Sequence, residues 1–186
     1  MHALPIIPSC NSGRPRAGQG RASAQLMLVG EQPGDSEDKS GKPFVGPAGR
    51  ILDRALKDAQ IARGDVYVTN AVKHFKYEMR GKRRLHKRPN AHEIERCKLW
   101  LDREINIVKP AIVVALGATA ARSLLGRAVT ISSARQTGNA LTGGTRVLVT
   151  IHPSFLLRLR DAADKEREYQ AFIADLRRAQ QLCKGI

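Results

Sequence analysis

The chain has 186 residues, a length that suits one domain with a sizeable core. It carries 32 Lys and Arg against 17 Asp and Glu, and the formal net charge of +15 predicts a polyanionic partner: DNA, RNA or an anionic membrane surface. No apolar run approaches the roughly 18 residues of a membrane span, and three widely spaced cysteines argue against a disulfide framework. We therefore expect a cytoplasmic protein without a membrane span.

The first 24 residues are rich in Pro, Gly, Ser and Arg and lack periodicity, which predicts a flexible basic arm ahead of a domain over residues 25–186. Alternating apolar runs and helical patterns follow. Strands are expected at 25–30, 65–70, 111–117 and 146–151, and helices at 50–61, 90–108, 118–126 and 164–183. Asn90 with Glu93 three residues later predicts the N-terminal cap of the second helix. Residues 31–49 and 71–89 are expected to be long loops.

Strands that read as unbroken apolar runs and alternate with helices are typical of a sheet covered on both faces. The sequence therefore predicts an α/β fold, a three-layer sandwich with a four-stranded parallel sheet flanked by helices. Ligands bind such sheets beyond the carboxyl ends of the strands. The loops after the first, second and fourth strands carry the unusual residue combinations, so we expect the functional site at this edge.

Single residues in these loops each allow two interpretations. Glu31 directly follows a strand, where a side chain can be aimed rigidly into a cleft, although the carboxylates of this loop also suit a polar turn or a helix N-cap. Phe44 either stands over a flat ligand or plugs into the core. Asn70 ends the second strand, and its amide suits the edge of a nucleobase, although Asn is also a common turn residue.

The fourth-strand loop, HPSFLLR, begins with His152 at the strand terminus. Ser154 could bind a phosphate. The apolar residues 155–157 beside Arg158 are either a wedge for a base stack or the buried face of a starting helix.

Residues 77–90, YEMRGKRRLHKRPN, surround one histidine, His86, with six cations. The cations are Arg80, Lys82, Arg83, Arg84, Lys87 and Arg88. Taken alone, such a run is a nucleic-acid patch or a solvated loop.

Taken together, the segments GEQPGDSED, GKPFVGPAGRILD, VYVTNAVKHFK, GKRRLHK, VALGATAARSLLG and HPSFLLR resemble the uracil-DNA glycosylase superfamily, and within it the family-4-like branch called UdgX. The resemblance runs from about Leu26 to the C-terminal helix. It implies a monomeric DNA repair enzyme that flips deoxyuridine out of DNA, preferably single-stranded, and cleaves the N-glycosidic bond.

The resemblance also implies roles for individual residues. Phe44 would stack on the flipped uracil, Asn70 would hydrogen-bond its edge, and His152 would stabilise the negative charge on the leaving base. The implied substrate contacts are Gln32, Asp35, Phe44, Asn70 and Ser154, and the implied DNA contacts are Lys82, Arg83, Arg84, Lys87 and Arg158.

In the UdgX branch the loop histidine, here His86, attacks the sugar C1′ and stays attached. A nucleophilic imidazole must be neutral; the nearby cations disfavour its protonation, and Glu31 is the candidate acceptor of its proton. The implied product is a single-turnover protein–DNA adduct. Two alternatives stay open: a family 4 glycosylase that turns over, with His86 only contacting DNA, and a non-catalytic DNA-binding module.

The resemblance further implies a 4Fe-4S cluster held by an N-terminal Cys-x-x-Cys pair and two later ligands. His74 and Cys97 match the later ligands, but the expected pair falls near Ala3 and Ile6. Cys10 is displaced and solitary, so the ligand set is incomplete. Either the cluster is absent, or Cys10 supplies a third ligand, or the natural N-terminus differs.

Overall fold

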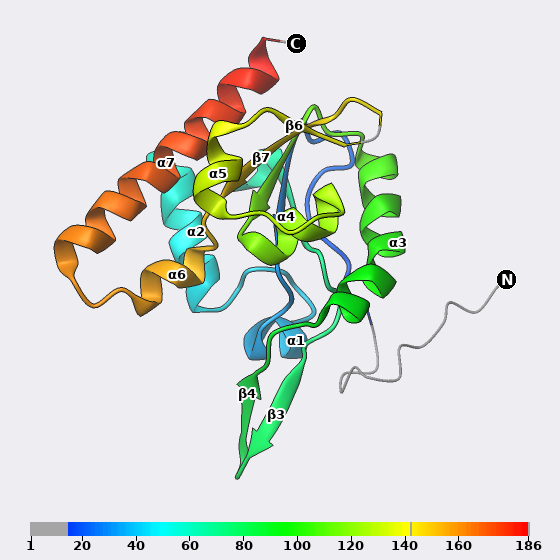
Figure 1. Ribbon diagram of the computed structural model, residues 1–186, viewed down its shortest axis with the longest axis vertical. Helices are drawn as coiled ribbons and strands as arrows, with labels where there is room; N and C mark the ends of the chain where they lie inside the picture. Colours follow the sequence, from blue (N-terminus) through cyan, green and yellow to red (C-terminus); the bar gives the residue numbers. More distant parts are fainter. Residues whose placement is uncertain (1–14, 142, 186) are drawn as a thin grey trace, which may run out of the picture.

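The computed structural model describes residues 15–141 and 143–185. A five-stranded sheet forms the middle layer, helices cover both of its faces, and a two-stranded hairpin projects from one end (Figure 1). The three-layer α/β sandwich is therefore confirmed. Over the described residues, no helix is both long and apolar enough to cross a membrane.

The sheet has the strand order β2-β1-β5-β7-β6. The strands are β1 (Leu26–Gly30), β2 (Val66–Asn70), β5 (Ile112–Leu116), β6 (Asn139–Ala140) and β7 (Arg146–Thr150). The four predicted strands are all present and parallel, but β6 adds a fifth strand, antiparallel to β7. A strand of two residues has neither an apolar run nor an alternating pattern, so the sequence gives no signal for it.

The helices are α1 (Asp35–Ser40), α2 (Pro47–Asp58), α3 (Ala91–Val108), α4 (Ala118–Leu125), α5 (Ile131–Gln136), α6 (Pro153–Arg158) and α7 (Ala162–Lys184), with a 3-10 turn at Arg63–Asp65. The predicted cap of α3 is confirmed, because the Asn90 side chain accepts the Glu93 N–H and Glu93 reaches back to the Asn90 N–H. Helices α1 and α5 were not predicted. Each has only six residues, too few to show a helical period.

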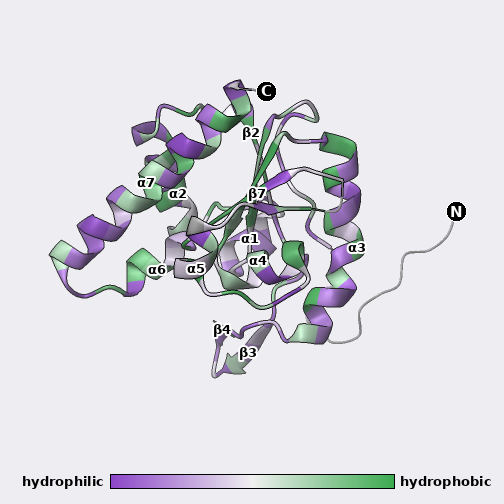
Figure 2. Cartoon of the chain, turned by 45° about the horizontal axis from the view of Figure 1, so that its top comes forward, coloured by the Kyte–Doolittle hydropathy of each residue, from purple (hydrophilic) through white to green (hydrophobic). Residues whose placement is uncertain are grey.

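Two apolar cores lie on opposite faces of the sheet. Side chains alternate along β1: Leu26 and Leu28 enter the core shared with α2 and α7, whereas Met27 and Val29 enter the core shared with α3 and α4. This double burial explains why the strands read as continuous apolar runs. Figure 2 shows α3 and α7 alternating between hydrophobic and hydrophilic colour along their length, as amphipathic covering helices do.

The predicted loop at 71–89 contains an antiparallel hairpin, β3 (Tyr77–Arg80) and β4 (Arg83–His86), in which Tyr77 lies opposite His86. The turn uses Gly81 at φ 60°. The hairpin is largely exposed, so it lacks the apolar face that marks a strand in sequence. The loop prediction was wrong for this segment.

The described part of the predicted arm, residues 15–24, lies against the domain. Gln19 and Val68 exchange backbone hydrogen bonds. The Gly18 N–H donates to Glu104, whose other carboxylate oxygen accepts from the buried Lys73 ammonium at 2.7 Å. Residues 1–14, including Cys10, lie outside the described residues.

Candidate functional site

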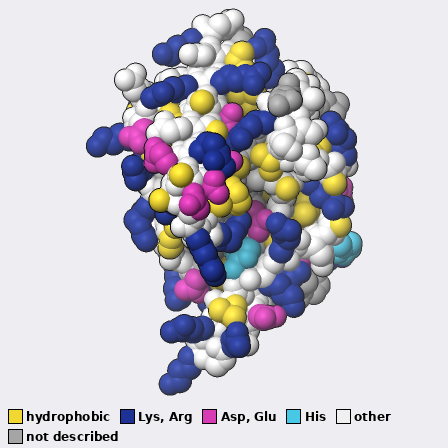
Figure 3. All heavy atoms as spheres, turned by 60° about the vertical axis from the view of Figure 1, so that its left-hand side comes forward, with side chains coloured by type: hydrophobic (Ala, Val, Ile, Leu, Met, Phe, Trp, Pro, Cys, Tyr) yellow, Lys and Arg dark blue, Asp and Glu magenta, His cyan; other side chains and the backbone are white. Residues whose placement is uncertain are grey.

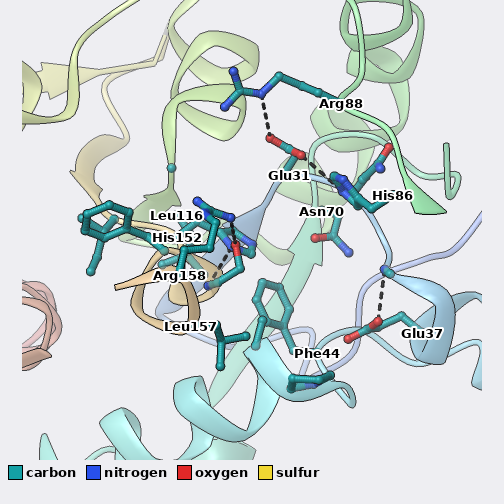
Figure 4. Close-up of a pocket in the computed structure, with 18 of the residues that line it drawn as sticks. Glu31, Glu37, Phe44, Asn70, His86, Arg88, Leu116, His152, Leu157 and Arg158 are labelled. Carbon is teal, nitrogen blue, oxygen red and sulfur yellow. Dashed lines mark hydrogen bonds and ion pairs between the residues drawn. The ribbon is translucent and has the colours of Figure 1, made fainter. Parts of the chain in front are cut away.

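A cavity of about 920 Å³ opens at the carboxyl ends of the parallel strands, where the fold prediction placed the site. The β1–α1 loop, the end of β2, the hairpin, the start of α4 and the β7–α6 junction all contribute to its wall (Figure 4). The predicted site residues that line it are Glu31, Gln32, Asp35, Phe44, Asn70, His86, His152, Ser154 and Arg158.

Phe44 and Asn70 meet over Gly30 at the floor of the cavity. A Cβ atom on Gly30 would lie 2.5 Å from both the Asn70 amide oxygen and the Phe44 ring, so only glycine allows this close approach. Phe44 has φ 54° and is 5% exposed. Its ring belongs to a core cluster, as one interpretation predicted, and it also lines the cavity, where a flat ligand would lie against it.

The Asn70 side chain ends in a buried acceptor. Its Oδ1 atom is buried and has no hydrogen-bond partner among the described residues. A buried polar atom is normally paired, because leaving it desolvated and unpaired costs about 1–3 kcal/mol. The Asn70 oxygen therefore points to a ligand that brings an N–H or O–H donor.

His152 caps α6 and presents one ring nitrogen for donation. The Ser154 backbone N–H donates to Nδ1 at 3.2 Å, and the Ser154 hydroxyl lies 2.8 Å from the same atom. Because Nδ1 accepts, the proton of the neutral ring resides on Nε2. Burial lowers the pKa of His152 from 6.5 to about 4; Glu31 opposes this shift, while Arg158 and His86 add to it. At neutral pH His152 is therefore a neutral hydrogen-bond donor. The centroids of the His152 and Phe44 rings lie 5.8 Å apart.

Glu31 stands between His86 and the start of α4. Its Oε1 lies 3.4 Å from Nε2 of the half-exposed His86, and its Oε2 accepts from the Thr119 hydroxyl at 2.5 Å. Arg88 Nε lies 4.0 Å from the same Oε2, so the carboxylate faces His86 and Arg88 on different sides (Figure 4). Thr119 was not among the predicted site residues, because the unusual residue combinations lie in the loops after the first, second and fourth strands. The third strand ends at the same edge of the sheet, and this was the available signal.

Gln32 holds the hairpin to the domain. Its amide nitrogen donates to the carbonyl oxygens of Lys76 at 3.3 Å and Lys87 at 3.1 Å, and its amide oxygen accepts the Lys76 N–H at 3.3 Å. These two carbonyls flank the hairpin on either side. The polar atoms of Gln32, predicted to contact substrate, therefore bind the backbone that carries His86.

Arg84 provides a second attachment for the hairpin. Its guanidinium donates to Asp35 at 2.5 Å and to Asp38 at 2.7 Å, and lies over the rings of Phe75 and Tyr77. The hydrogen bond from Lys39 lowers the pKa of Asp35; desolvation opposes this shift, and Arg84 adds to it. Arg84, predicted to contact DNA, and Asp35, predicted to contact substrate, thus form an ion pair with each other.

The remaining predicted DNA contacts lie on the outside. Lys82 and Arg83 are exposed at the hairpin tip, and Lys87 lies 3.4 Å from Glu78. Figure 3 shows Lys and Arg side chains on the projecting hairpin and around the hollow beside it. Of the six cations in residues 77–90, Arg84 is thus partly buried and paired with two carboxylates, and the other five are exposed to solvent.

Helix α6 begins at Pro153, so residues 155–157 lie in a helix, as one of the two interpretations predicted. Leu156 is buried in the core, whereas Leu157 is 48% exposed and lines the cavity beside Arg158. Arg158 also donates to the Ser154 hydroxyl at 3.3 Å.

The two predicted metal ligands within the described residues do not form a cluster site. Cys97 is fully buried against Val72 and Ile94, its Sγ accepts the Lys73 N–H, and burial raises the pKa of its thiol. His74 is buried as well. Over residues 15–141 and 143–185, no group of three or more His, Cys, Asp or Glu side chains is arranged to hold a metal ion. The described donors therefore do not fit a four-ligand cluster.

Comparison with known proteins identifies the family. A model described as the Uracil DNA glycosylase superfamily matches residues 17–177. The Type-4 uracil-DNA glycosylase of Thermotoga maritima is 40% identical over 144 residues, which cover 77% of this chain and 71% of that protein. The Type-4 uracil-DNA glycosylase of Pyrobaculum aerophilum is 42% identical over 108 residues, which cover 58% of this chain and 52% of that protein. The Type-5 uracil-DNA glycosylase of the same organism is 31% identical over 158 residues, which cover 76% of this chain and 66% of that protein. This chain belongs to the uracil-DNA glycosylase superfamily.

Proposed function

We propose that the protein excises uracil from DNA and then stays covalently attached to the abasic sugar through His86. The observation that carries the excision is the buried Oδ1 of Asn70, which has no hydrogen-bond partner within residues 15–141 and 143–185 and lies in a cavity lined by Phe44 and His152. Uracil offers an N3–H donor beside the O4 acceptor, which complements the oxygen and nitrogen of one amide. The names of the Type-4 relatives support the same substrate.

Base release then follows from the two rings. Phe44 stacks on the flipped base, and Nε2–H of neutral His152 donates to the uracil O2 as the C1′–N1 bond breaks. The bonding electron pair leaves with the uracil, and the sugar becomes oxocarbenium-like. A donor that is fixed and neutral before the reaction stabilises the developing anion without a proton transfer.

Capture of the sugar uses His86 and Glu31. A neutral imidazole nitrogen attacks C1′ and forms a new C–N bond, which leaves an imidazolium. The Glu31 carboxylate, 3.4 Å from the ring, accepts the imidazolium proton, so the adduct carries a neutral, substituted imidazole. Because the nucleophile is consumed, each molecule acts once.

The outward cations supply the attraction to DNA. Lys82 and Arg83 at the hairpin tip and Arg158 beside the cavity suit phosphate contacts on both sides of a flipped nucleotide. A single strand needs no unpairing before the base flips, which favours it as the substrate. Residues 25–186 act as a single, monomeric domain in this proposal.

A denaturing gel tests the proposal directly. The protein is mixed with a labelled single-stranded oligonucleotide containing one uracil, heated in detergent and separated. We expect a shifted band in the wild type, none in His86→Ser, and an unchanged band in His92→Ser, an exposed histidine on α3. A thymine oligonucleotide of the same sequence should give no band.

Each other outcome assigns a different function. Alkali-labile abasic sites without a shifted band would identify a turnover glycosylase, the function that the Type-4 relatives' names favour. If neither the shifted band nor the abasic site forms, the protein is a DNA-binding module without this activity. A shifted band that persists in His86→Ser would show that another residue is the nucleophile, and a full adduct yield from Glu31→Gln would remove Glu31 from the capture step.

A further inference from the structure

We propose that Thr119 positions Glu31 for the capture step, and so sets the share of cleaved sugars that become attached to His86. The inference rests on the proposed function, since it concerns the partition between adduct and free abasic product. It assigns Thr119 a role through Glu31 and not by contact with the reacting atoms.

Sheet topology brings Thr119 to Glu31. Strand β5 pairs directly with β1, and both point their carboxyl ends at the cavity. After β5 the chain turns at Gly117, which has φ 92°, and α4 begins at once. A Cβ atom on Gly117 would lie 3.0 Å from the Cβ of His152. Thr119 is the second residue of this helix, beside the residue that follows β1.

The hydroxyl of Thr119 is available to hydrogen-bond with Glu31. A threonine further along a helix can bond back to a carbonyl of the preceding turn, but in the first turn no helical carbonyl precedes it. Thr119 is 8% exposed and donates to Glu31 Oε2 at 2.5 Å. This is the length of a charge-assisted O–H···O⁻ bond, and such bonds are about twice as strong as neutral ones.

This hydrogen bond gives the two carboxylate oxygens of Glu31 different partners. With Oε2 held by Thr119, Oε1 is the oxygen that faces His86. The terminal torsion of a glutamate is otherwise broad and nearly two-fold. Thr119 therefore fixes the plane in which Glu31 meets the imidazole.

Arg88 is the competitor that makes this restraint necessary. Its side chain is 79% exposed, and its Nε lies 4.0 Å from Glu31 Oε2. A guanidinium prefers to bind both oxygens of a carboxylate at once. Without the Thr119 hydroxyl, Glu31 is expected to turn toward Arg88 and lose its alignment with His86.

The test separates capture from cleavage in Thr119→Val, which keeps the shape and removes the hydroxyl, and in Thr119→Ser, which keeps the hydroxyl. Under single-turnover conditions, total cleavage is measured after alkali and attachment on a heated gel. In Thr119→Val, attachment should slow about 10- to 100-fold, the loss expected for a hydrogen bond to a charged group. Cleavage should change less than threefold, and Thr119→Ser should restore the wild-type partition.

Ser123→Ala on the same helix is the matched control. Ser123 is buried, and its hydroxyl has no partner among the described residues, so its removal should leave the partition unchanged. If Thr119→Val fails to fold, Thr119→Ala replaces it in the comparison with Thr119→Ser.

The outcomes distinguish this inference from the proposed function. A wild type that leaves only abasic sites overturns both. A wild type that forms the adduct, with Thr119→Val equally fast, overturns the role of Thr119 alone. An equal loss of cleavage and attachment, or no recovery in Thr119→Ser, shows that Thr119 only maintains the local structure.

Discussion

Asn70 offers its amide oxygen to a ligand, and replacing it with alanine is expected to slow uracil excision about 10- to 100-fold, because paired edge contacts contribute about 1–3 kcal/mol. Asn70→Asp keeps the side-chain shape but cannot donate to the uracil O4, and should be at least as slow. Single-turnover cleavage of a uracil oligonucleotide measures both. Wild-type rates in Asn70→Asp would mean that Asn70 shapes the cavity floor without reading the base.

His152 should make the fold sensitive to acid. Its folded pKa of about 4 lies below the usual 6.5, so between these values the unfolded chain binds a proton that the folded chain does not. The contribution of His152 to the free energy of unfolding should therefore be fully present above pH 6.5. The free energy of unfolding should fall by up to about 3 kcal/mol as the pH drops to about 4.

Urea unfolding of the wild type and His152→Gln across this pH range isolates that contribution. The difference between the two proteins should shrink as the pH falls, whereas His92→Gln should follow the wild type. A constant difference would contradict a His152 that is neutral in the folded protein.

The sequence predicted several site residues because parallel strands end at one edge. Glu31, Asn70 and His152 each follow or end such a strand, and all three reach the cavity. The contacts of Gln32 and Asp35 were not predictable, because their partners lie on a hairpin whose existence the sequence did not reveal.

The hairpin is a separate element that carries the nucleophile, and Arg84 holds it in place. Arg84→Met should slow attachment about tenfold, since a partly exposed ion pair to two carboxylates contributes about 1–2 kcal/mol. The melting temperature should change by no more than a few degrees, because the hairpin lies outside both cores. Gel quantification of adduct against time provides the measurement.

Arg83→Met is the matched control, since Arg83 is the exposed neighbour on the same strand. Attachment is measured at saturating oligonucleotide, so that the lost phosphate contact of Arg83 does not limit the rate. Equal attachment rates in the two variants would show that the Arg84 contacts do not place His86. Uracil cleavage should survive in both, because the groups that hold the base lie on the domain and not on the hairpin.

At the scale of elements, the prediction succeeded where burial produces a pattern. The four parallel strands and the helices at 90–108 and 118–126 contribute regular apolar faces to two cores. The hairpin and β6 lack such faces. The strands of the hairpin and β6 are fixed by backbone pairing with their neighbouring strands. Such pairing leaves no periodic apolar pattern in the sequence.

The net charge of +15 belongs to the whole molecule, but its effect on DNA binding should concentrate at the hairpin tip. Each phosphate contact on a single strand releases about 0.7 counterion, and the logarithm of the association constant falls with the logarithm of salt accordingly. Lys82→Gln with Arg83→Gln should therefore reduce that slope by about 1.4.

The measurement uses His86→Ser as the common background, because a covalent product would prevent equilibrium. Fluorescence anisotropy at several salt concentrations gives the slope for each protein. Arg103→Gln with Lys109→Gln removes the same charge from the opposite end of α3, where both residues are exposed, and should lower the slope by less than 0.5. If both pairs reduce the slope equally, the protein binds DNA through its overall charge, and the hairpin tip makes no phosphate contact of its own.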